Sequence, residues 1–293
     1  MTVPLSPPSG HDDLERYRTR LFGIAYRMLG QVQDAEDLVQ ETFLRWQQRS
    51  PTEDIREPEA WLVTVLTRLA IDRLRHAAAE RAVYIGPWLP EPIASDRLAP
   101  DREVEVASDL SLAFLVLLER LGPEERAAFL LREVFDSGYD EIARTLERSE
   151  AAARQVVHRA RERVREARAR FPVPPDAKER LLRSFLRAIE ADDKEAMLAV
   201  LAPEATFTSD GGGKVRAARR PVRGAERIAR MLSGIERKFH WPFRYRLGHV
   251  NGEPALIQFR GDALFAVSCI DTDGERIRAV YRVMNPDKLR YAR

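Results

Sequence analysis

Hydrophobic residues recur every three or four positions through most of residues 11–170. This period is that of helices with one apolar face, and helices of moderate length joined by short loops predict a bundle. The helices expected before residue 136 are Asp12–Leu29, Asp34–Arg49, Glu59–His76, Glu103–Leu121 and Pro123–Phe135.

Three residues mark the expected helix ends. Gly30 follows the last apolar position of the first helix and is expected to close it, because glycine tolerates the left-handed conformation of a C-cap. Asp34 is expected to cap the second helix, since a carboxylate can accept the first free backbone N–H groups. Pro123 occupies the favoured first turn of its helix.

Residues 139–170 combine a short apolar-patterned helix, the turn Glu147-Arg148-Ser149 and an arginine-rich helix. From Glu150 to Arg170 there are seven arginines against three glutamates. This arrangement predicts a helix-turn-helix whose second helix, capped by Ser149, faces DNA. The alternative interpretation is a basic helix that simply faces solvent, and the preceding turn makes it the weaker one.

The second of these helices has a polar and an apolar side. Arginine can recognise guanine and glutamine adenine in the major groove. The residues expected to meet base edges are Arg154, Gln155, His158 and Arg159. The packed side has Val156, Val157, Ala160 and Val164. Arg161, Arg163 and Arg165 are expected to touch phosphates or water. His158 has no second ligand nearby, so no metal site is predicted.

Beyond Asp176 the pattern changes to helices followed by alternating strands. The pattern predicts an α+β domain with a curved antiparallel sheet. The expected helices are Lys178–Glu190, Asp193–Leu201 and Ala225–Lys238. The expected strands are Ala205–Ser209, Phe243–Val250, Ala255–Phe259, Ala263–Ile270 and Arg276–Met284. In the last strand, apolar residues alternate with Arg276, Arg278 and Arg282, which predicts one buried face and one wet face.

Length and composition fit a multidomain protein. The chain has 293 residues, of which 44% are hydrophobic and 32% charged, enough for packed cores and for two or three domains. All five lysines lie at or beyond Lys178, whereas there are 43 arginines in the whole chain. This step, with three prolines in residues 171–177, predicts a domain boundary there.

The charge distribution and the single cysteine narrow the partners and the compartment. The net charge is only +2, but residues 31–60 carry eight acidic residues against three arginines. An acidic face beside a basic helix predicts a protein partner in addition to DNA. Cys269 is the only cysteine, and no signal peptide or membrane-length apolar run is found. A cytoplasmic protein without a membrane partner is therefore expected.

Residues 84–108 form an aromatic and proline-rich segment with two interpretations. It is either a flexible tether or a linker that docks Trp88 and Leu89 in a groove. Docking is favoured, because a tryptophan and a leucine left in water are costly.

The motifs described so far resemble those of bacterial sigma factors of the extracytoplasmic-function type. Asp34–Trp46 is similar to their region 2 polymerase-binding helix, and Glu59–Arg75 to the helix that opens the promoter. Leu121–Arg126 together with the helix-turn-helix resembles region 4. Three such matches in the right order over about 160 residues are specific, whereas one alone would be weak.

A narrower resemblance spans the whole chain. Trp88-Leu-Pro-Glu-Pro92, Asp210-Gly-Gly-Gly-Lys214 and Asn285-Pro-Asp-Lys-Leu289 are similar to motifs of the sigma factors that carry a C-terminal SnoaL-like domain. This resemblance implies that the extension regulates the factor in cis. The implied interdomain residues are Trp88, Leu89, Pro90, Asp210, Gly211, Gly212, Gly213, Lys214, Asn285, Pro286, Asp287, Lys288 and Leu289. Glu147, Arg148 and Ala153 depart from common helix-turn-helix patterns, which use Gly, an apolar residue and Val or Ile there.

The resemblance also implies binding residues for two macromolecules, core RNA polymerase and promoter DNA. The polymerase is expected to contact Asp37, Gln40, Glu41, Leu44 and Arg45. Promoter DNA is expected to contact Arg68, Arg73 and Arg75 in region 2 and Arg154, Gln155, His158, Arg159 and Arg161 in region 4. Trp46 and Trp61 have core-like spacing, and burial is favoured over base stacking for both.

The expected fold is two all-α domains followed by an α+β SnoaL-like cone. The corresponding ranges are a disordered N-terminus (1–10), sigma region 2 (11–82), a linker (83–107), sigma region 4 (108–170), a second linker (171–176) and the SnoaL-like regulatory domain (177–293).

The C-terminal domain contains candidate polar residues but no catalytic motif. Asp210, His240, His249 and Asp262 have no motif that places them together, so structural roles are favoured over catalysis. The triple glycine either cradles an anion or packs against the linker or the sigma domains, and its spacing favours packing. No cofactor is expected, although relatives of this cone fold can hold a small molecule, and an unidentified ligand stays among the expected partners. Two other hypotheses are an enzyme with an attached DNA-binding segment and a ligand-controlled repressor.

Overall fold

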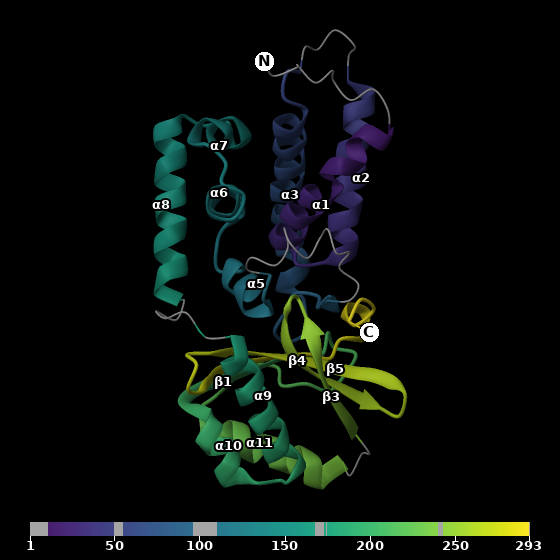
Figure 1. Ribbon diagram of the computed structural model, residues 1–293, viewed down its shortest axis with the longest axis vertical. Helices are drawn as coiled ribbons and strands as arrows, with labels where there is room; N and C mark the ends of the chain where they lie inside the picture. The colour runs from purple at the N-terminus through teal and green to yellow at the C-terminus, as the bar shows by residue number, and fades with distance from the viewer. Residues whose placement is uncertain are drawn as a thin grey trace. The chain divides into compact units, whose positions relative to one another are not determined.

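The computed structural model describes residues 11–49, 55–95, 110–167, 173, 175–239 and 243–292. Their packing divides the chain into two compact units, which are described separately (Figure 1). The N-terminal unit contains described residues up to 79 and from 118 to 166. The C-terminal unit contains residues 80–95 and 110–117 together with the described residues from 167 onward. The predicted disordered N-terminus, His240 and parts of both predicted linkers lie outside the described residues.

The N-terminal unit is helical, as its apolar periodicity predicts. Its helices are α1 (His11–Leu29), α2 (Val32–Gln48), most of α3 (Pro58–Ala82), α6 (Pro123–Glu133), α7 (Tyr139–Leu146) and α8 (Glu150–Ala167). Trp46 is buried and meets Trp61 edge to face at 5.3 Å, so the predicted burial of Trp46 is confirmed. The buried Arg126 of α6 donates hydrogen bonds to the Met28 carbonyl at 2.6 Å and to Glu119 at 2.8 Å. A buried guanidinium therefore joins α6 to the end of α1.

The helix ends agree with one prediction and correct another. Gly30 has φ 71° and its N–H bonds to the Tyr26 carbonyl, so its closure of α1 is confirmed. The predicted cap at Asp34 is wrong: α2 begins at Val32, with Gln31 at the N-cap position. Because the helix starts two residues earlier, Asp34 lies in the first turn, where its carboxylate accepts hydrogen bonds from Gln31 and Arg73.

The helix-turn-helix forms despite its unusual turn. Glu147 closes α7 in the left-handed conformation, with φ 54°, where a glycine would avoid a steric cost of about 1 kcal/mol. The predicted cap at Ser149 is confirmed, since its hydroxyl accepts the Ala152 N–H at 3.3 Å. Ala153 is fully buried, so this small residue lies at the packed side of α8.

The C-terminal unit is built on a six-stranded sheet of order β2-β1-β6-β5-β4-β3. The strands are β1 (Leu201–Asp210), β2 (Val222–Arg223), β3 (Phe243–Val250), β4 (Glu253–Arg260), β5 (Ala263–Thr272) and β6 (Ile277–Val283). The helices are α5 (Leu112–Leu118), α9 (Pro175–Glu190), α10 (Lys194–Val200), α11 (Ala225–Phe239) and the 3₁₀ turn η2 (Pro286–Lys288). The predicted helix Glu103–Leu121 is therefore represented by α5, and its first part lies outside the described residues.

The prediction of a wholly antiparallel sheet is wrong at one pair. β1 runs parallel to β6, whereas the other neighbouring strands are antiparallel. These two strands open and close the sheet in sequence order, and the long segment between them provides the crossover that parallel strands require. Strand periodicity carries no information about this pairing.

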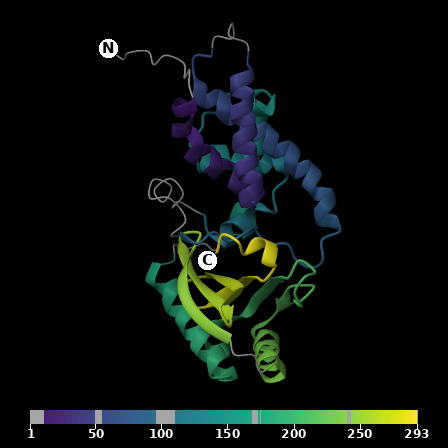
Figure 2. The same cartoon turned by 90° about the vertical axis from the view of Figure 1, so that its right-hand side faces the viewer.

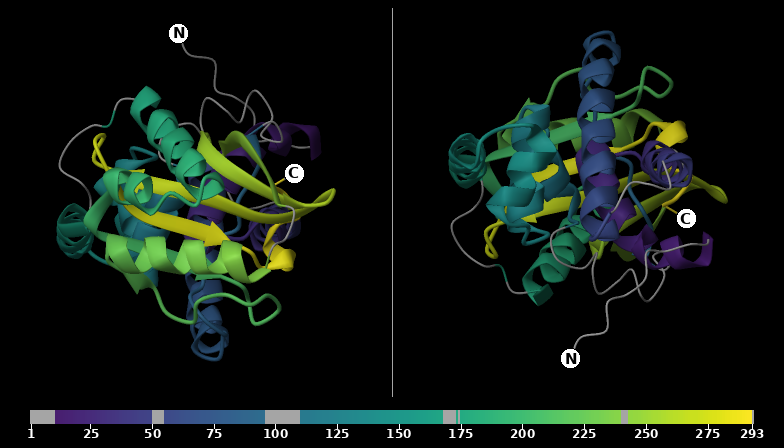
Figure 3. Two further views of the ribbon diagram at one scale, coloured as in Figure 1. Left: turned by 90° about the horizontal axis from the view of Figure 1, so that it is seen from below. Right: turned by 90° about the horizontal axis from the view of Figure 1, so that it is seen from above.

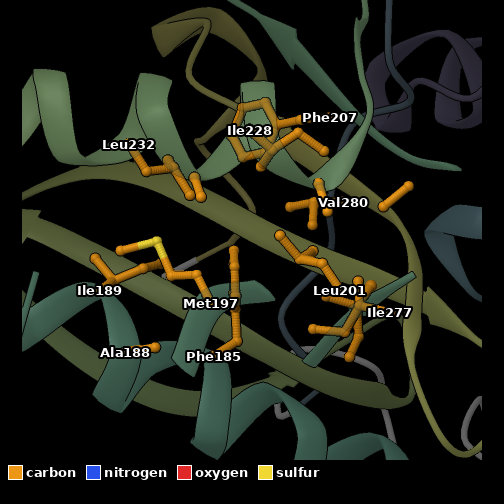
Figure 4. Close-up of a cluster of buried hydrophobic side chains, with 14 of the residues drawn as sticks. Phe185, Ala188, Ile189, Met197, Leu201, Phe207, Ile228, Leu232, Ile277 and Val280 are labelled. Atoms are coloured by element: carbon orange, nitrogen blue, oxygen red, sulfur yellow. The ribbon is translucent and has the colours of Figure 1, made fainter. Parts of the chain in front are cut away.

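Both faces of the curved sheet are covered within the C-terminal unit (Figure 2). The helices α9 and α11 lie on one side of it (Figure 3, left), over a core that includes Phe185, Met197 and Val280 (Figure 4). The opposite face packs on Leu89, Leu112 and other apolar residues from the linker, α5 and the C-terminal segment. The predicted wet face of the last strand is therefore wrong for Arg282, which lies half-buried on the helix-covered side with Val280.

None of the described helices is long and apolar enough to cross a lipid bilayer.

Candidate functional site

The predicted base-reading residues share one exposed stripe of α8. Arg154, Gln155, His158 and Arg159 are all exposed. The opposite side is buried and consists of Ala153, Val156, Val157, Ala160 and Val164. The division of this helix into a packed face and an accessible basic face is therefore confirmed.

Glutamates of α6 and α8 bind several arginines of α8. Arg161 donates to Glu133 at 2.9 Å, and this hydrogen bond raises the pKa of Arg161. Arg163 is ion-paired with Glu125. Arg154 pairs with Glu150 at 3.1 Å and lies 4.2 Å from the Tyr139 ring centroid. These acids neutralise part of the charge of the basic helix.

The arginines of the predicted promoter-opening helix are held by the region 4 segment and by α2. Arg68 donates to the carbonyls of Arg144 at 2.6 Å and Thr145 at 3.1 Å, which lie in the last turn of α7, where carbonyls lack a full set of intrahelical partners. Its cation also favours the negative end of that helix dipole.

Two further arginines of α3 bind carboxylates, as Arg68 also does with Glu147 at 3.0 Å. Arg75 pairs with Glu124 at 3.0 Å, and Arg73 with Asp34 at 2.9 Å. Glu124 also binds Arg148 of the helix-turn-helix at 2.7 Å. Arg75 of α3 and Arg148 of the turn therefore share one carboxylate, Glu124.

The predicted polymerase-binding residues follow one side of α2. Asp37, Gln40, Leu44 and Arg45 are exposed and Glu41 is partly exposed. Leu44 has 49% of its surface accessible, which is high for a large aliphatic side chain. Arg45 and Glu41 form an ion pair at 2.9 Å. An apolar residue surrounded by polar ones matches the composition of a protein contact surface.

Three motifs far apart in the sequence meet at Asp210. This carboxylate is fully buried and accepts four hydrogen bonds. Oδ1 accepts from the Tyr84 hydroxyl at 2.6 Å and the Gly212 N–H at 3.0 Å. Oδ2 accepts from the Leu89 N–H at 2.9 Å and the Lys288 ammonium at 2.7 Å. We call Asp210, Lys288, Tyr84 and Leu89 the linker node.

Lys288 is the second charge of the linker node. Its ammonium also donates to the Leu89 carbonyl at 2.6 Å, so both backbone polar groups of Leu89 are bound. The Nζ atom lies 4.1 Å from the Trp88 ring centroid and 4.9 Å from that of Tyr84. Burial lowers the pKa of Lys288 to about 8, against the attraction of Asp210. Burial, and then the hydrogen bond to Asp210, raises the pKa of Tyr84.

The docked interpretation of the linker is confirmed within the C-terminal unit. Leu89 is buried in the apolar cluster on the outer face of the sheet, and Pro90 is buried as well. The Ile93 N–H donates to the Asn251 side chain at 3.0 Å, and the Asn251 N–H returns a hydrogen bond to the Ile93 carbonyl at 2.8 Å. The Ala94 N–H reaches the Tyr291 carbonyl at 2.7 Å.

The triple glycine permits close approach to two neighbours. Gly212 and Gly213 have φ angles of 58° and 72°, and a Cβ on either would overlap Asn285 or Ile85. Gly211 is buried beside this turn. The packing interpretation of the glycines is therefore supported, although Gly213 faces Ile85 and not the Trp88–Pro92 motif.

The remaining predicted interdomain residues divide into buried and surface positions. Leu289 is buried and belongs to the cluster around Leu89. Asn285 caps η2 and donates to the Tyr84 hydroxyl at 2.9 Å. Lys214 and Asp287 form an exposed ion pair at 2.6 Å, and Pro286 is exposed.

No sequence motif contained Tyr84 or Arg81. Tyr84 lies four residues before the Trp88 motif and matches no motif itself. Arg81, at the end of α3, lies 3.8 Å over the Trp88 ring. Aromatic residues at the start of a proline-rich linker are the only signal that points to them.

The polar candidates for acid/base chemistry are not assembled into a site. Asp210 is fully buried and accepts hydrogen bonds from the linker node and from Gly212, and His249 and Asp262 are exposed. His240 lies outside the described residues.

Comparison with known proteins identifies both helical regions. Residues 14–80 match the Sigma-70 region 2 family and residues 111–164 match the Sigma-70 region 4 family. The ECF RNA polymerase sigma factor SigJ of Mycobacterium tuberculosis is 38% identical over 290 residues, covering 94% of this chain and 92% of SigJ. The probable ECF RNA polymerase sigma factor SigI of the same species is 32% identical over 276 residues, covering 93% of this chain and 92% of SigI.

The crystal structure of M. tuberculosis SigJ has a similar fold, with a TM-score of 0.76 and 34% identity. The match covers 96% of this chain and 98% of the SigJ chain, so it includes the C-terminal unit. The predicted combination of two helical sigma regions and an α+β SnoaL-like cone is confirmed.

The chain belongs to the extracytoplasmic-function family of RNA polymerase sigma factors. It binds core RNA polymerase and promoter DNA and directs the initiation of transcription.

Proposed function

Because the chain is an extracytoplasmic-function sigma factor, we propose that its SnoaL-like domain regulates transcription in cis by holding the linker between regions 2 and 4. The linker node is the observation that carries this function. Its buried Asp210–Lys288 pair binds both backbone polar groups of Leu89. A buried ion pair that directs most of its remaining hydrogen bonds at one segment is a specific latch for that segment.

Docking restrains the reach of the chain between the two DNA-binding regions. A free linker samples a wide range of end-to-end distances, whereas Tyr84–Ser95 in the docked state follows one path on the cone. Recognition of two promoter elements requires a defined separation of regions 2 and 4. We propose that the docked path keeps regions 2 and 4 from adopting this separation, so docking inhibits and release activates.

We assign the promoter-binding residues to two sets. Arg154, Gln155, His158 and Arg159 read base edges of the upstream element, and Arg161 contacts the phosphate backbone. Their support is the shared exposed stripe of α8. Arg68, Arg73 and Arg75 bind the downstream element. DNA must compete with Glu124, Asp34 and the α7 carbonyls for these three arginines.

The exposed side of α2 binds the polymerase. Asp37, Gln40 and Glu41 supply polar complementarity, and Arg45 extends the same side by one turn. Leu44 supplies the apolar centre, because its exposed surface becomes buried on docking.

We also assign the remaining properties of the molecule. The chain works as a non-enzymatic factor in the cytoplasm, where its polymerase acts. Its functional ranges are region 2 (11–82), the linker (83–107), region 4 (108–170) and the SnoaL-like regulatory domain (177–293), with a short linker (171–176) before the last. The support for a structural and not a catalytic role of the cone is that Asp210 is fully used in the linker node.

Run-off transcription with core polymerase tests the proposal. Asp210→Asn and Lys288→Met each remove one charge of the linker node, and we expect each to raise transcription several-fold. The matched control is the exposed pair, with Lys214→Ala and Asp287→Ala expected to leave transcription unchanged. Lowered transcription in the node variants would overturn inhibition by docking, and unchanged transcription would overturn regulation through the node.

Truncated chains provide an independent comparison. A chain ending near Pro174 lacks the whole cone, and a chain ending before Asn285 lacks Lys288 and the segment around it. We expect the shorter deletion to reproduce the effect of Lys288→Met. Turnover of a substrate by the full chain, lost in His249→Ala with transcription intact, would instead support an enzymatic function.

A further inference from the structure

A cavity of about 470 Å³ lies inside the C-terminal unit between the helices and the sheet. Its walls are mainly apolar and aromatic, and they include Ile189, Phe207 and Leu232, which point into the same interior region (Figure 4). Phe243 and Phe265 continue the apolar wall from β3 and β5, with their ring centroids 5.1 Å apart. A volume of this size, lined in this way, is that of a small-molecule site.

One wall of the cavity carries an ordered polar chain. Tyr245 and Gln258 face each other across the β3–β4 pair, and the Gln258 amide N–H donates to the Tyr245 hydroxyl at 3.1 Å. The Arg282 guanidinium donates to the carbonyl oxygen of Gln258. Because Gln258 is bound at both ends, its orientation is set and it holds Arg282 against the cavity wall. Gln258 is also buried, with only 2% of its surface exposed.

The charged side chains that line the cavity are positive. The charged residues that line the cavity are Arg282, which is half-buried, and Arg216, which is exposed. A guanidinium beside apolar side chains attracts an anion more strongly than it would in water, since the surrounding dielectric constant is lower. Its planar N–H groups match the two oxygens of a carboxylate.

We propose that this cavity binds an apolar monocarboxylate, with its carboxylate on Arg282 and its tail among Phe207, Leu232 and Phe265. At about 30 Å³ for each water-sized group, the cavity accommodates roughly fifteen non-hydrogen atoms. This size corresponds to a medium-chain fatty acid or an aromatic acid of similar bulk.

The cavity and the linker node share the ends of two strands. Ser209 and Met284 line the cavity, and the next residues in the chain are Asp210 and Asn285. The Asp210 carbonyl accepts the Met284 N–H at 2.7 Å and the Asn285 N–H at 2.9 Å, so the two strand ends are tied together. A bound acid is therefore positioned to shift the equilibrium between the docked and the released linker at the node. This coupling rests on the proposed function, whereas binding itself does not.

Calorimetric titration of the full-length chain tests the site, with dodecanoate below its micellar concentration as the probe. We expect dodecanoate to bind with micromolar affinity and to be preferred at least tenfold over 1-dodecanol and dodecylammonium. Arg282→Met keeps the length of the side chain and removes its charge, and we expect it to weaken dodecanoate binding roughly 10- to 100-fold. Binding of 1-dodecanol should change little in this variant.

Arg278→Met is the matched control on the same strand. Arg278 lies outside the cavity lining and pairs with Glu204 at 3.5 Å, so its replacement should leave dodecanoate binding unchanged. Absence of dodecanoate binding to the wild-type chain would overturn the site. Equal affinity for the alcohol, or equal dodecanoate affinity in Arg282→Met, would overturn carboxylate recognition.

Run-off transcription with and without dodecanoate tests the coupling separately. We expect the acid to change transcription by the wild-type chain and to have no effect on Arg282→Met. Binding without any change in transcription would overturn the coupling and leave the site intact. The node variants without ligand test the proposed function, so the two failures are distinguishable.

Discussion

Removing one charge from the linker node should weaken docking of the linker by more free energy than the few hydrogen bonds of that side chain would suggest. In Lys288→Met, the fully buried Asp210 carboxylate loses its counter-cation, and in Asp210→Asn the buried ammonium loses its counter-anion. Breaking one partner of a buried pair costs about 3–5 kcal/mol, because the remaining charge is left desolvated and uncompensated.

The double variant Asp210→Asn/Lys288→Met contains neither charge. Additive effects would give about 6–10 kcal/mol, but the penalty of an isolated buried charge is absent when both are removed. We therefore expect the double variant to be no worse than either single variant by more than about 1 kcal/mol. The resulting coupling energy should be at least about 2 kcal/mol.

Hydrogen exchange of the segment around Leu89 measures this effect directly. The Leu89 N–H donates to Asp210, so its exchange rate reports undocking of the linker. Mass spectrometry of the peptide spanning residues 84–92 should show exchange about 100- to 4,000-fold faster in each single variant. The exposed Lys214–Asp287 pair should show less than about 1 kcal/mol of coupling in the same cycle. Additive effects at the node would refute the reasoning.

Four further predictions concern other parts of the molecule. In filter binding of the holoenzyme to promoter DNA, Arg154→Ala should weaken binding about 10- to 100-fold at some promoters and not at others. Arg163→Ala should weaken binding uniformly and reduce the slope of log affinity against log salt by about one. Leu44→Asp should weaken association with core polymerase at least tenfold in sedimentation, and unchanged association would exclude α2 as the contact. Gly212→Ala should destabilise the docked linker by more than about 1 kcal/mol in the exchange assay, because the residue has φ 58° and a Cβ would overlap a neighbouring amide. Burial lowers the pKa of Lys288 from 10.5 to about 8, so the folded chain releases this proton at a lower pH than the unfolded chain does. As the pH rises above 8, the free energy of unfolding of the wild type should therefore increase by up to about 1.4 kcal/mol per pH unit relative to Lys288→Met, as measured by urea unfolding.

Sequence patterns alone determined the local elements of this protein. The packed and accessible sides of α8 follow from apolar spacing, because both sides are properties of one helix and need no distant partner. The same holds for the strand Phe243–Val250, whose predicted and observed bounds coincide. The resemblance carried by the motifs at Trp88, Asp210 and Asn285 predicted a contact among them, although not its chemistry.

Only the tertiary structure decided which groups meet. The parallel β1–β6 pair depends on a crossover that no local pattern encodes, and it brings the ends of both strands to the linker node. Tyr84 joins Asp210 across 126 positions of the chain and matches no motif. Arg282 follows an alternating pattern that predicts a wet face, yet the linker covers the other face of the sheet and leaves this arginine inside the cone. Sequence periodicity specifies that a strand has two faces, but what covers each face depends on segments packed from elsewhere in the chain.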